Sequence, residues 1–105
     1  MTSAPSGTPL GYLIAEIDVH DANAYAAYPP KASASVDAFG GRYIVRGGRS
    51  ETLEGAQPTR VVVIEFPSLE AAKAWYESEE YQAAIPFRTA CSSGRLFIIE
   101  GSPSD

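Results

Sequence analysis

The 105-residue sequence contains a single cysteine, Cys91, and a single histidine, His20. One cysteine excludes a disulfide within the chain, which fits a reducing compartment, and we interpret Cys91 as a small packing residue. A zinc site usually takes three or four nitrogen or sulfur ligands, so we expect no metal site. A haem would have only His20 as its axial ligand, and we expect no cofactor.

Long apolar runs and basic clusters are also missing. Apolar runs are only a few residues long, far short of the roughly 20 that span a bilayer, so we expect no membrane partner. The start, Met1–Pro5, lacks the features of a secretory signal, and we expect a cytoplasmic location. A net charge of −5 disfavours nucleic acid as a partner. No P-loop or G-x-G-x-x-G motif follows a predicted strand, so these nucleotide-binding motifs are unsupported.

The sequence is long enough for one compact core and too short for two, with 45% hydrophobic residues. Its two ends are short and rich in Pro, Ser and Gly. We therefore predict a single domain over residues 10–101, with flexible tails at residues 1–9 and 102–105.

Alternating apolar residues predict four strands. In the first, Leu13, Ala15 and Ile17 share one face. In the second, Arg42, Ile44 and Arg46 are expected on one face, opposite Tyr43 and Val45. The predicted strands are Leu10–Val19, Arg42–Arg46, Arg60–Phe66 and Arg95–Glu100.

Helices are predicted in two regions between these strands. In the first region, Asp21 is an N-cap, Pro29 and Pro30 kink or divide the helix, and Gly40 is a left-handed C-cap. In the second region, serines cap two pieces, and Pro86 is expected to bend or end the last of them. The predicted helical segments are Ala22–Tyr28, a second piece to Phe39, Leu69–Tyr76, and a piece that follows Ser78.

The resulting order, β-α-β-β-α-β, predicts an α+β ferredoxin-like domain with a four-stranded antiparallel sheet. Helices on one face leave the other face bare, yet both faces of the strands carry apolar side chains. A second copy, packed sheet against sheet by a two-fold axis, would cover that face. We therefore predict a homodimer.

Several motifs resemble those of the family called domain of unknown function 1330, within the dimeric α+β barrel group. The resemblance covers roughly residues 11–101 and implies the ferredoxin-like fold and the dimer, but no general activity. The broader group includes cofactor-independent monooxygenases, isomerases, haem enzymes and ligand-binding modules. The motifs are Tyr12, Tyr28, Gly40–Gly48, Leu53–Gly55, Val63–Ser68, Ala71–Tyr76, Ser78–Tyr81, Pro86–Arg88 and Glu100–Gly101.

Arg88 shares a helical stripe with Tyr81, Ala84 and Ile85, so its guanidinium is expected to face the sheet. Such an inward arginine needs a partner. One interpretation is structural, with Arg88 bound to helix-end carbonyls or to Glu65. The other is a clamp for a carboxylate or enolate ligand.

Arg42, Arg46 and Glu65 lie in predicted neighbouring strands. If their faces coincide, they form a cross-strand ion pair, which is the interpretation we favour. The alternative is that Glu65 acts as a general base beside an arginine that stabilises an anion. His20, at the end of the first strand, is a second candidate for proton transfer.

Aromatic residues are candidates to line a pocket, although core and interface packing is their commoner role. We take Tyr28, Trp75 and Tyr81 as candidate ligand-binding residues together with Arg42, Arg46 and Arg88. The sequence therefore predicts a small-molecule-binding homodimer. It is either a cofactor-independent enzyme for proton transfer or oxygenation of a small organic acid or aromatic metabolite, or a non-catalytic structural or binding protein.

Overall fold

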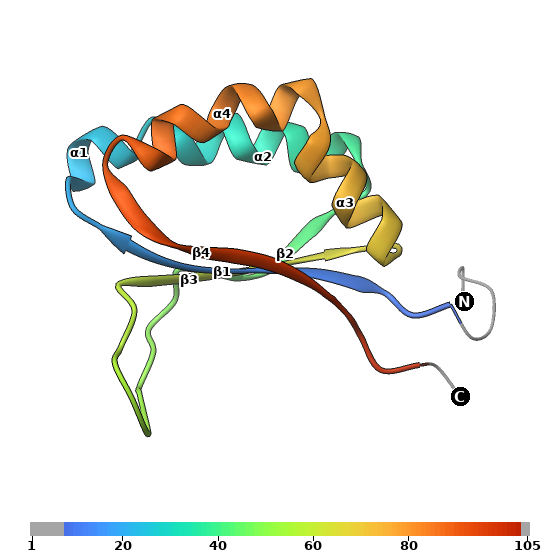
Figure 1. Ribbon diagram of the computed structural model, residues 1–105, viewed down its shortest axis with the longest axis horizontal. Helices are drawn as coiled ribbons and strands as arrows, with labels where there is room; N and C mark the ends of the chain where they lie inside the picture. The colour runs from blue at the N-terminus through green and yellow to red at the C-terminus, as the bar shows by residue number, and fades with distance from the viewer. Residues whose placement is uncertain (1–7, 104–105) are drawn as a thin grey trace.

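A computed structural model describes residues 8–103 as one sheet with a layer of helices on one face (Figure 1). The predicted tails lie outside the described residues, apart from residues 8–9 and 102–103. The elements are β1 (Gly11–Val19), α1 (Ala22–Tyr25), α2 (Tyr28–Ala38), β2 (Arg42–Arg46), β3 (Arg60–Phe66), α3 (Leu69–Glu77), α4 (Glu79–Thr89) and β4 (Ser92–Glu100).

The sheet has the strand order β2-β3-β1-β4, and all three pairings are antiparallel. This confirms the predicted α+β architecture and its β-α-β-β-α-β order. The start of β4 was predicted wrongly at Arg95, because the Ser92-Ser93-Gly94 segment has turn composition. The ladder with β1 extends β4 back to Ser92, which pairs with Val19.

The predicted caps are present at three helices. Asp21, Ser68 and Ser78 each accept a hydrogen bond from a backbone N–H in the first turn. The Pro29-Pro30 pair falls in the first turn of α2, so the region is divided into α1 and α2 as expected. Gly40 has a φ of 76°, which confirms the left-handed residue that ends α2.

Pro86 lies inside α4, so of the two predicted outcomes, a bend or an end of the helix, the end is wrong. A proline removes one N–H and leaves the carbonyl four residues earlier, here that of Gln82, without its helical donor. Pro86 and Gln82 are both exposed. Both residues therefore lie on the solvent side of the helix, and α4 continues to Thr89.

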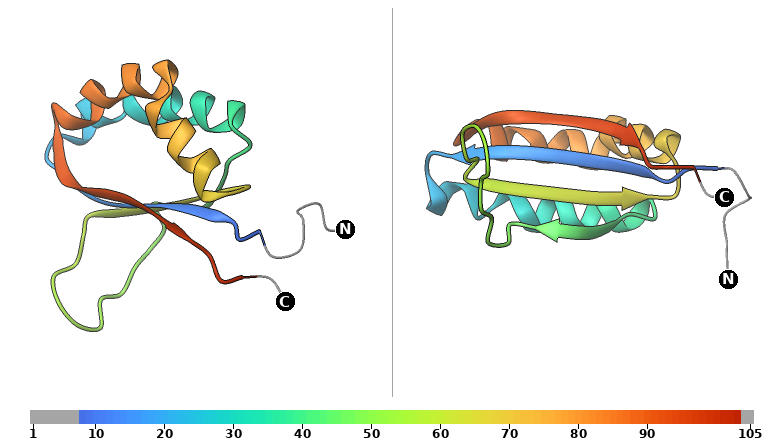
Figure 2. Two further views of the ribbon diagram at one scale, coloured as in Figure 1. Left: turned by 45° about the vertical axis from the view of Figure 1, so that its right-hand side comes forward. Right: turned by 90° about the horizontal axis from the view of Figure 1, so that it is seen from below.

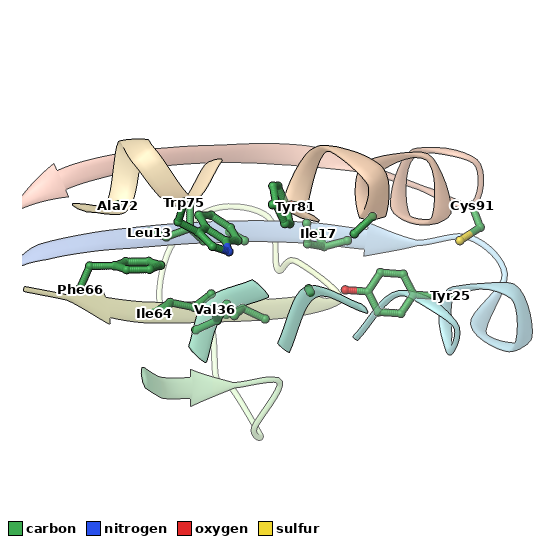
Figure 3. Close-up of a cluster of buried hydrophobic side chains, with 14 residues drawn as sticks. Leu13, Ile17, Tyr25, Val36, Ile64, Phe66, Ala72, Trp75, Tyr81 and Cys91 are labelled. Carbon is green, nitrogen blue, oxygen red and sulfur yellow. The ribbon is translucent and has the colours of Figure 1, made fainter. Parts of the chain in front are cut away.

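The core lies between the sheet and the helices and is centred on Trp75 (Figure 3). The Trp75 ring centroid is 4.1 Å from that of Tyr81 and 5.4 Å from that of Phe66. Its indole N–H donates to the buried Ser35 hydroxyl at 2.9 Å, and Ser35 donates to the Ala32 carbonyl at 2.6 Å. The polar atoms of this core are therefore paired, and they join α2 to α3.

Within residues 8–103, no helix covers the other face of the sheet (Figure 2). An apolar row crosses all four strands on this face, since Val45 pairs with Val63, Val63 with Ile14, and Ile14 with Phe97. The neighbouring rows each contain an ion pair, Arg42 with Glu65 on one side and Arg95 with Glu16 on the other. An apolar centre with polar margins is typical of a protein interface.

The segment between β2 and β3 stands away from the sheet on this same bare side (Figures 1 and 2). Leu53 in this segment is 88% exposed. Within residues 8–103, no helix combines the length and apolar character needed to cross a membrane.

Candidate functional site

A β-bulge in β2 decides which arginines reach the helix-covered face. Arg42 pairs with Glu65 and Tyr43 with Ile64, but the register then shifts, so that Val45 pairs with Val63 and Arg46 with Val62. One extra residue in a strand reverses the alternation of the side chains that follow it. Arg42 therefore lies on the bare face and Arg46 on the helix side, so the prediction that they share a face is wrong.

A narrow cavity lies on the helix side of the sheet. It is small, with a volume of about 30 Å³. Most of its walls are apolar, and its polar groups come from three tyrosines and two arginines. The lining residues are Leu13, Ala15, Ile17, Tyr25, Tyr28, Pro29, Ala32, Tyr43, Arg46, Arg60, Val62, Ile64, Trp75 and Leu96.

Arg46 and Arg60 lie at the β2–β3 side of this cavity as diagonal neighbours across the ladder. The Cζ of Arg46 is 4.0 Å from the ring centroid of Tyr43, and that of Arg60 is 5.8 Å from the ring centroid of Tyr25. Among residues 8–103, the ion pairs involve neither arginine. Two guanidinium groups without carboxylate partners therefore face one cavity, an arrangement that an anion would stabilise.

Gly47 permits this arrangement. Its φ is 67°, and a side chain at this position would overlap the Arg60 guanidinium. The backbone at the end of β2 therefore approaches Arg60 as closely as only glycine allows.

A second polar cluster lies beside the cavity on the helices. The hydroxyls of Tyr28 and Tyr81 are hydrogen-bonded at 2.6 Å, and the Cζ of Arg88 is 5.9 Å from the Tyr28 ring centroid. Tyr81 and Ala84 are buried and Arg88 is half-buried, which confirms the inward stripe on α4. Arg88 has no ion pair among residues 8–103, and its Nε is buried without a hydrogen-bond partner there.

The tyrosines around the cavity remain neutral. Burial is the main cause that raises the pKa of Tyr25, Tyr28 and Tyr43. Burial acts to lower the pKa of Arg88, but the neighbouring phenols of Tyr81 and Tyr28 raise it above its ordinary value. The cavity therefore offers cationic and neutral hydrogen-bond donors over the ordinary pH range.

Glu65 lies on the opposite face of the sheet. Its carboxylate accepts from Arg42 Nε at 3.1 Å and from the Tyr12 hydroxyl at 3.2 Å. The favoured cross-strand ion pair is thus confirmed, with Arg42 as the partner. The structure does not bring Glu65 together with Arg46 and Arg88.

His20 lies at the end of β1, where its Nε2 is 3.0 Å from the Ser93 hydroxyl. It borders a shallow hollow beside α4 with Asp21, Phe87 and the buried Cys91. This hollow is separate from the arginine-lined cavity. Within residues 8–103, no three His, Cys, Asp or Glu side chains come together as metal ligands would.

Of the candidate ligand-binding residues, Arg46, Tyr28 and Trp75 line the cavity, and Tyr81 and Arg88 lie directly behind Tyr28. Sequence reasoning missed Arg60, Tyr25 and Tyr43. Arg60 had a visible signal, because it alternates with the buried residues Val62 and Ile64 on the core face of β3. Tyr43 had no such signal, because the bulge that brings Arg46 beside it cannot be recognised from the alternation of residues in the sequence.

The fold belongs to a class that includes oxygenases among its solved members. SnoaB, a cofactor-independent oxygenase from Streptomyces nogalater, matches with a TM-score of 0.64 and 10% identity, over 92% of this chain and 97% of that chain. A candidate antibiotic biosynthesis monooxygenase from Caulobacter crescentus matches with a TM-score of 0.65 and 19% identity, over 95% and 94% of the two chains. At such identities the likeness establishes the α+β ferredoxin-like fold.

Within this class, the chain belongs to the family described as domain of unknown function DUF1330, whose model matches residues 10–102. The RPA0582 protein of unknown function from Rhodopseudomonas palustris has a similar structure, with a TM-score of 0.74 and 21% identity, over 90% of this chain and 83% of that chain. No curated protein matches the sequence.

Proposed function

We propose that the chain forms a cytoplasmic homodimer that binds a small organic anion in the cavity between its sheet and helices. The observation that carries the ligand proposal is the pair Arg46 and Arg60. Both line an otherwise mainly apolar cavity, and neither has a carboxylate partner among the described residues. In a protein of net charge −5, guanidinium groups left without acidic partners favour an external anion.

The homodimer is proposed from the bare face of the sheet. Its central apolar row, Val45, Val63, Ile14 and Phe97, has no covering layer within the described chain. The polar margins on both sides would form the rim of the interface, and the projecting segment with Leu53 would lie along the second copy.

The anion site is tested by calorimetric titration with benzoate and with its neutral analogue benzamide. We expect wild-type protein to bind benzoate more tightly than benzamide. Arg60→Gln should weaken benzoate binding about 10- to 100-fold, because a hydrogen bond to a charged group contributes about 1.5–3 kcal/mol. Arg49→Gln removes the same charge from the exposed β2–β3 segment and is the matched control.

Equal binding of benzoate and benzamide by the wild type would refute the anion site. An equal loss of benzoate affinity in Arg60→Gln and Arg49→Gln would show that the change in net charge alone causes the loss. The proposed site requires the loss to be specific to the cavity arginine.

A cofactor-independent enzyme is the second candidate, favoured by the likeness to SnoaB. The residues that line the cavity are cationic or neutral, and none of them is His, Asp or Glu. They are suited to stabilise an enolate or phenolate rather than to remove a proton from carbon themselves. Glu65 and His20 lie elsewhere, so the proton would pass to water or to the ligand's own base.

This second candidate is tested with phenylpyruvate, an aromatic 2-oxo acid that enolises. In D₂O, nuclear magnetic resonance should show faster deuterium uptake at its benzylic carbon with wild-type protein than with Arg60→Gln. Equal rates of deuterium uptake with wild-type protein, Arg60→Gln and buffer alone would show that the protein does not catalyse enolisation. The enzyme proposal would then be refuted, and the proposal of ligand binding would stand.

A further inference from the structure

The cluster of Tyr28, Tyr81 and Arg88 contains more hydrogen-bond donors than acceptors. A guanidinium has five N–H groups and no acceptor, and each phenol has one O–H. The two phenol oxygens are the acceptors of this cluster, and one O–H is used in the 2.6 Å bond between them. The buried Nε of Arg88 has no partner among residues 8–103. The cluster therefore lacks an acceptor.

A ligand in the cavity can supply a hydrogen-bond acceptor beside Tyr28. Tyr81 is fully buried and does not line the cavity, whereas Tyr28 does. When Tyr81 donates to Tyr28, the Tyr28 proton is left free for a group in the cavity. An oxygen atom of a ligand beside Tyr28 would accept this proton and extend the chain of hydrogen bonds.

This site and the arginine pair lie around the same cavity. Tyr25 connects them, because its ring is 5.8 Å from the Arg60 Cζ and 5.6 Å from the Tyr28 ring centroid. Figure 3 shows the Tyr25 hydroxyl turned toward the middle of the buried hydrophobic cluster. A ligand thus meets guanidinium groups at one end, a phenol donor at the other, and apolar walls between them.

We infer that the ligand is a small hydroxy or oxo carboxylic acid, and that the side chains around the small cavity move apart to admit it. Its carboxylate binds Arg46 and Arg60, and its second oxygen accepts a hydrogen bond from Tyr28. This inference rests on the proposed function and adds the second oxygen, which the arginine pair does not require.

The experiment compares benzoate with its three hydroxybenzoate isomers by calorimetric titration. At least one isomer should bind wild-type protein about three- to tenfold more tightly than benzoate, the range expected for one added hydrogen bond. In Tyr28→Phe this preference should fall to about one. Tyr76→Phe, which changes an exposed phenol outside the cavity lining, should keep the preference.

The wild type alone supplies a second measurement, independent of how well Tyr28→Phe folds. The fluorobenzoate that corresponds to the preferred isomer has a similar shape but a poor acceptor, so it should bind no more tightly than benzoate. A hydroxyl preference that survives in Tyr28→Phe, or an equally favoured fluorobenzoate, would overturn the inference.

The titrations distinguish a failure of the second oxygen site at Tyr28 from a failure of the anion site at Arg46 and Arg60. If benzoate binds and no hydroxybenzoate is preferred, the second oxygen site is refuted and the anion site stands. If neither benzoate nor any hydroxybenzoate binds, both are refuted.

Discussion

Phe97→Asp is expected to convert the proposed dimer into monomers at concentrations where the wild type associates. Phe97 ends the apolar row on the bare face of the sheet and is 39% exposed in the single chain. A second copy would bury the new carboxylate without a partner, at a cost of several kcal/mol per ion. Each dimer contains two copies, so the dissociation constant should rise more than about a hundredfold. Sedimentation equilibrium measures this change directly.

Phe87→Asp is the matched control for this experiment. Phe87 is 43% exposed and lies on α4, on the opposite side of the molecule from the bare face. The same change of residue type there should leave the dimer intact. A monomeric wild type, or equal effects of the two substitutions, would refute the sheet-to-sheet interface.

Trp75→Ala is expected to lower the free energy of unfolding by about 3–5 kcal/mol. Trp75 is 1% exposed, packs against Phe66 and Tyr81, and donates to Ser35. Its removal leaves a large void and an unused acceptor in the core. Since a small domain has only about 5–15 kcal/mol in total, the variant should be close to unfolding at room temperature. Urea denaturation followed by circular dichroism measures the loss.

Two further variants separate the causes of this loss. Trp75→Phe keeps an aromatic ring but removes the N–H donor to Ser35, so it should cost less than Trp75→Ala. Tyr76→Ala changes the next residue, which is 39% exposed, and should cost about 1 kcal/mol. A small effect of Trp75→Ala, similar to that of Tyr76→Ala, would show that this part of the core is loosely packed.

The parts of the fold that could be predicted from the sequence depend on local physics. The alternation in β1 separates Leu13 and Ala15 from Tyr12 and Ile14, and the structure confirms these faces. Asp21, Ser68 and Ser78 cap helices because a short polar side chain satisfies the free N–H groups wherever a helix starts. Pro86 shows the limit of local rules, because α4 continues past it to Thr89.

The candidate site was harder to predict because its members meet only through pairing between strands. Arg46 and Arg60 are 14 positions apart, and the ladder between β2 and β3 makes them neighbours. The bulge between Tyr43 and Val45 then moves Arg46 to the other face from Arg42. A regular alternation of side chains places Arg46 on the same face as Arg42. It therefore separates Arg46 from Tyr43, and Tyr43 was missed as a member of the site.

The bulge in β2 also makes the register of this strand a determinant of two properties at once. If all five residues of β2 paired in turn, without the bulge, Arg46 would face away from the cavity, onto the side proposed to meet the second copy. The loss of the bulge would thus remove a cation from the ligand and add one to the subunit contact. Among relatives of this chain, the presence of a bulge in this short strand would therefore sort anion-binding members from those that cannot bind in this way.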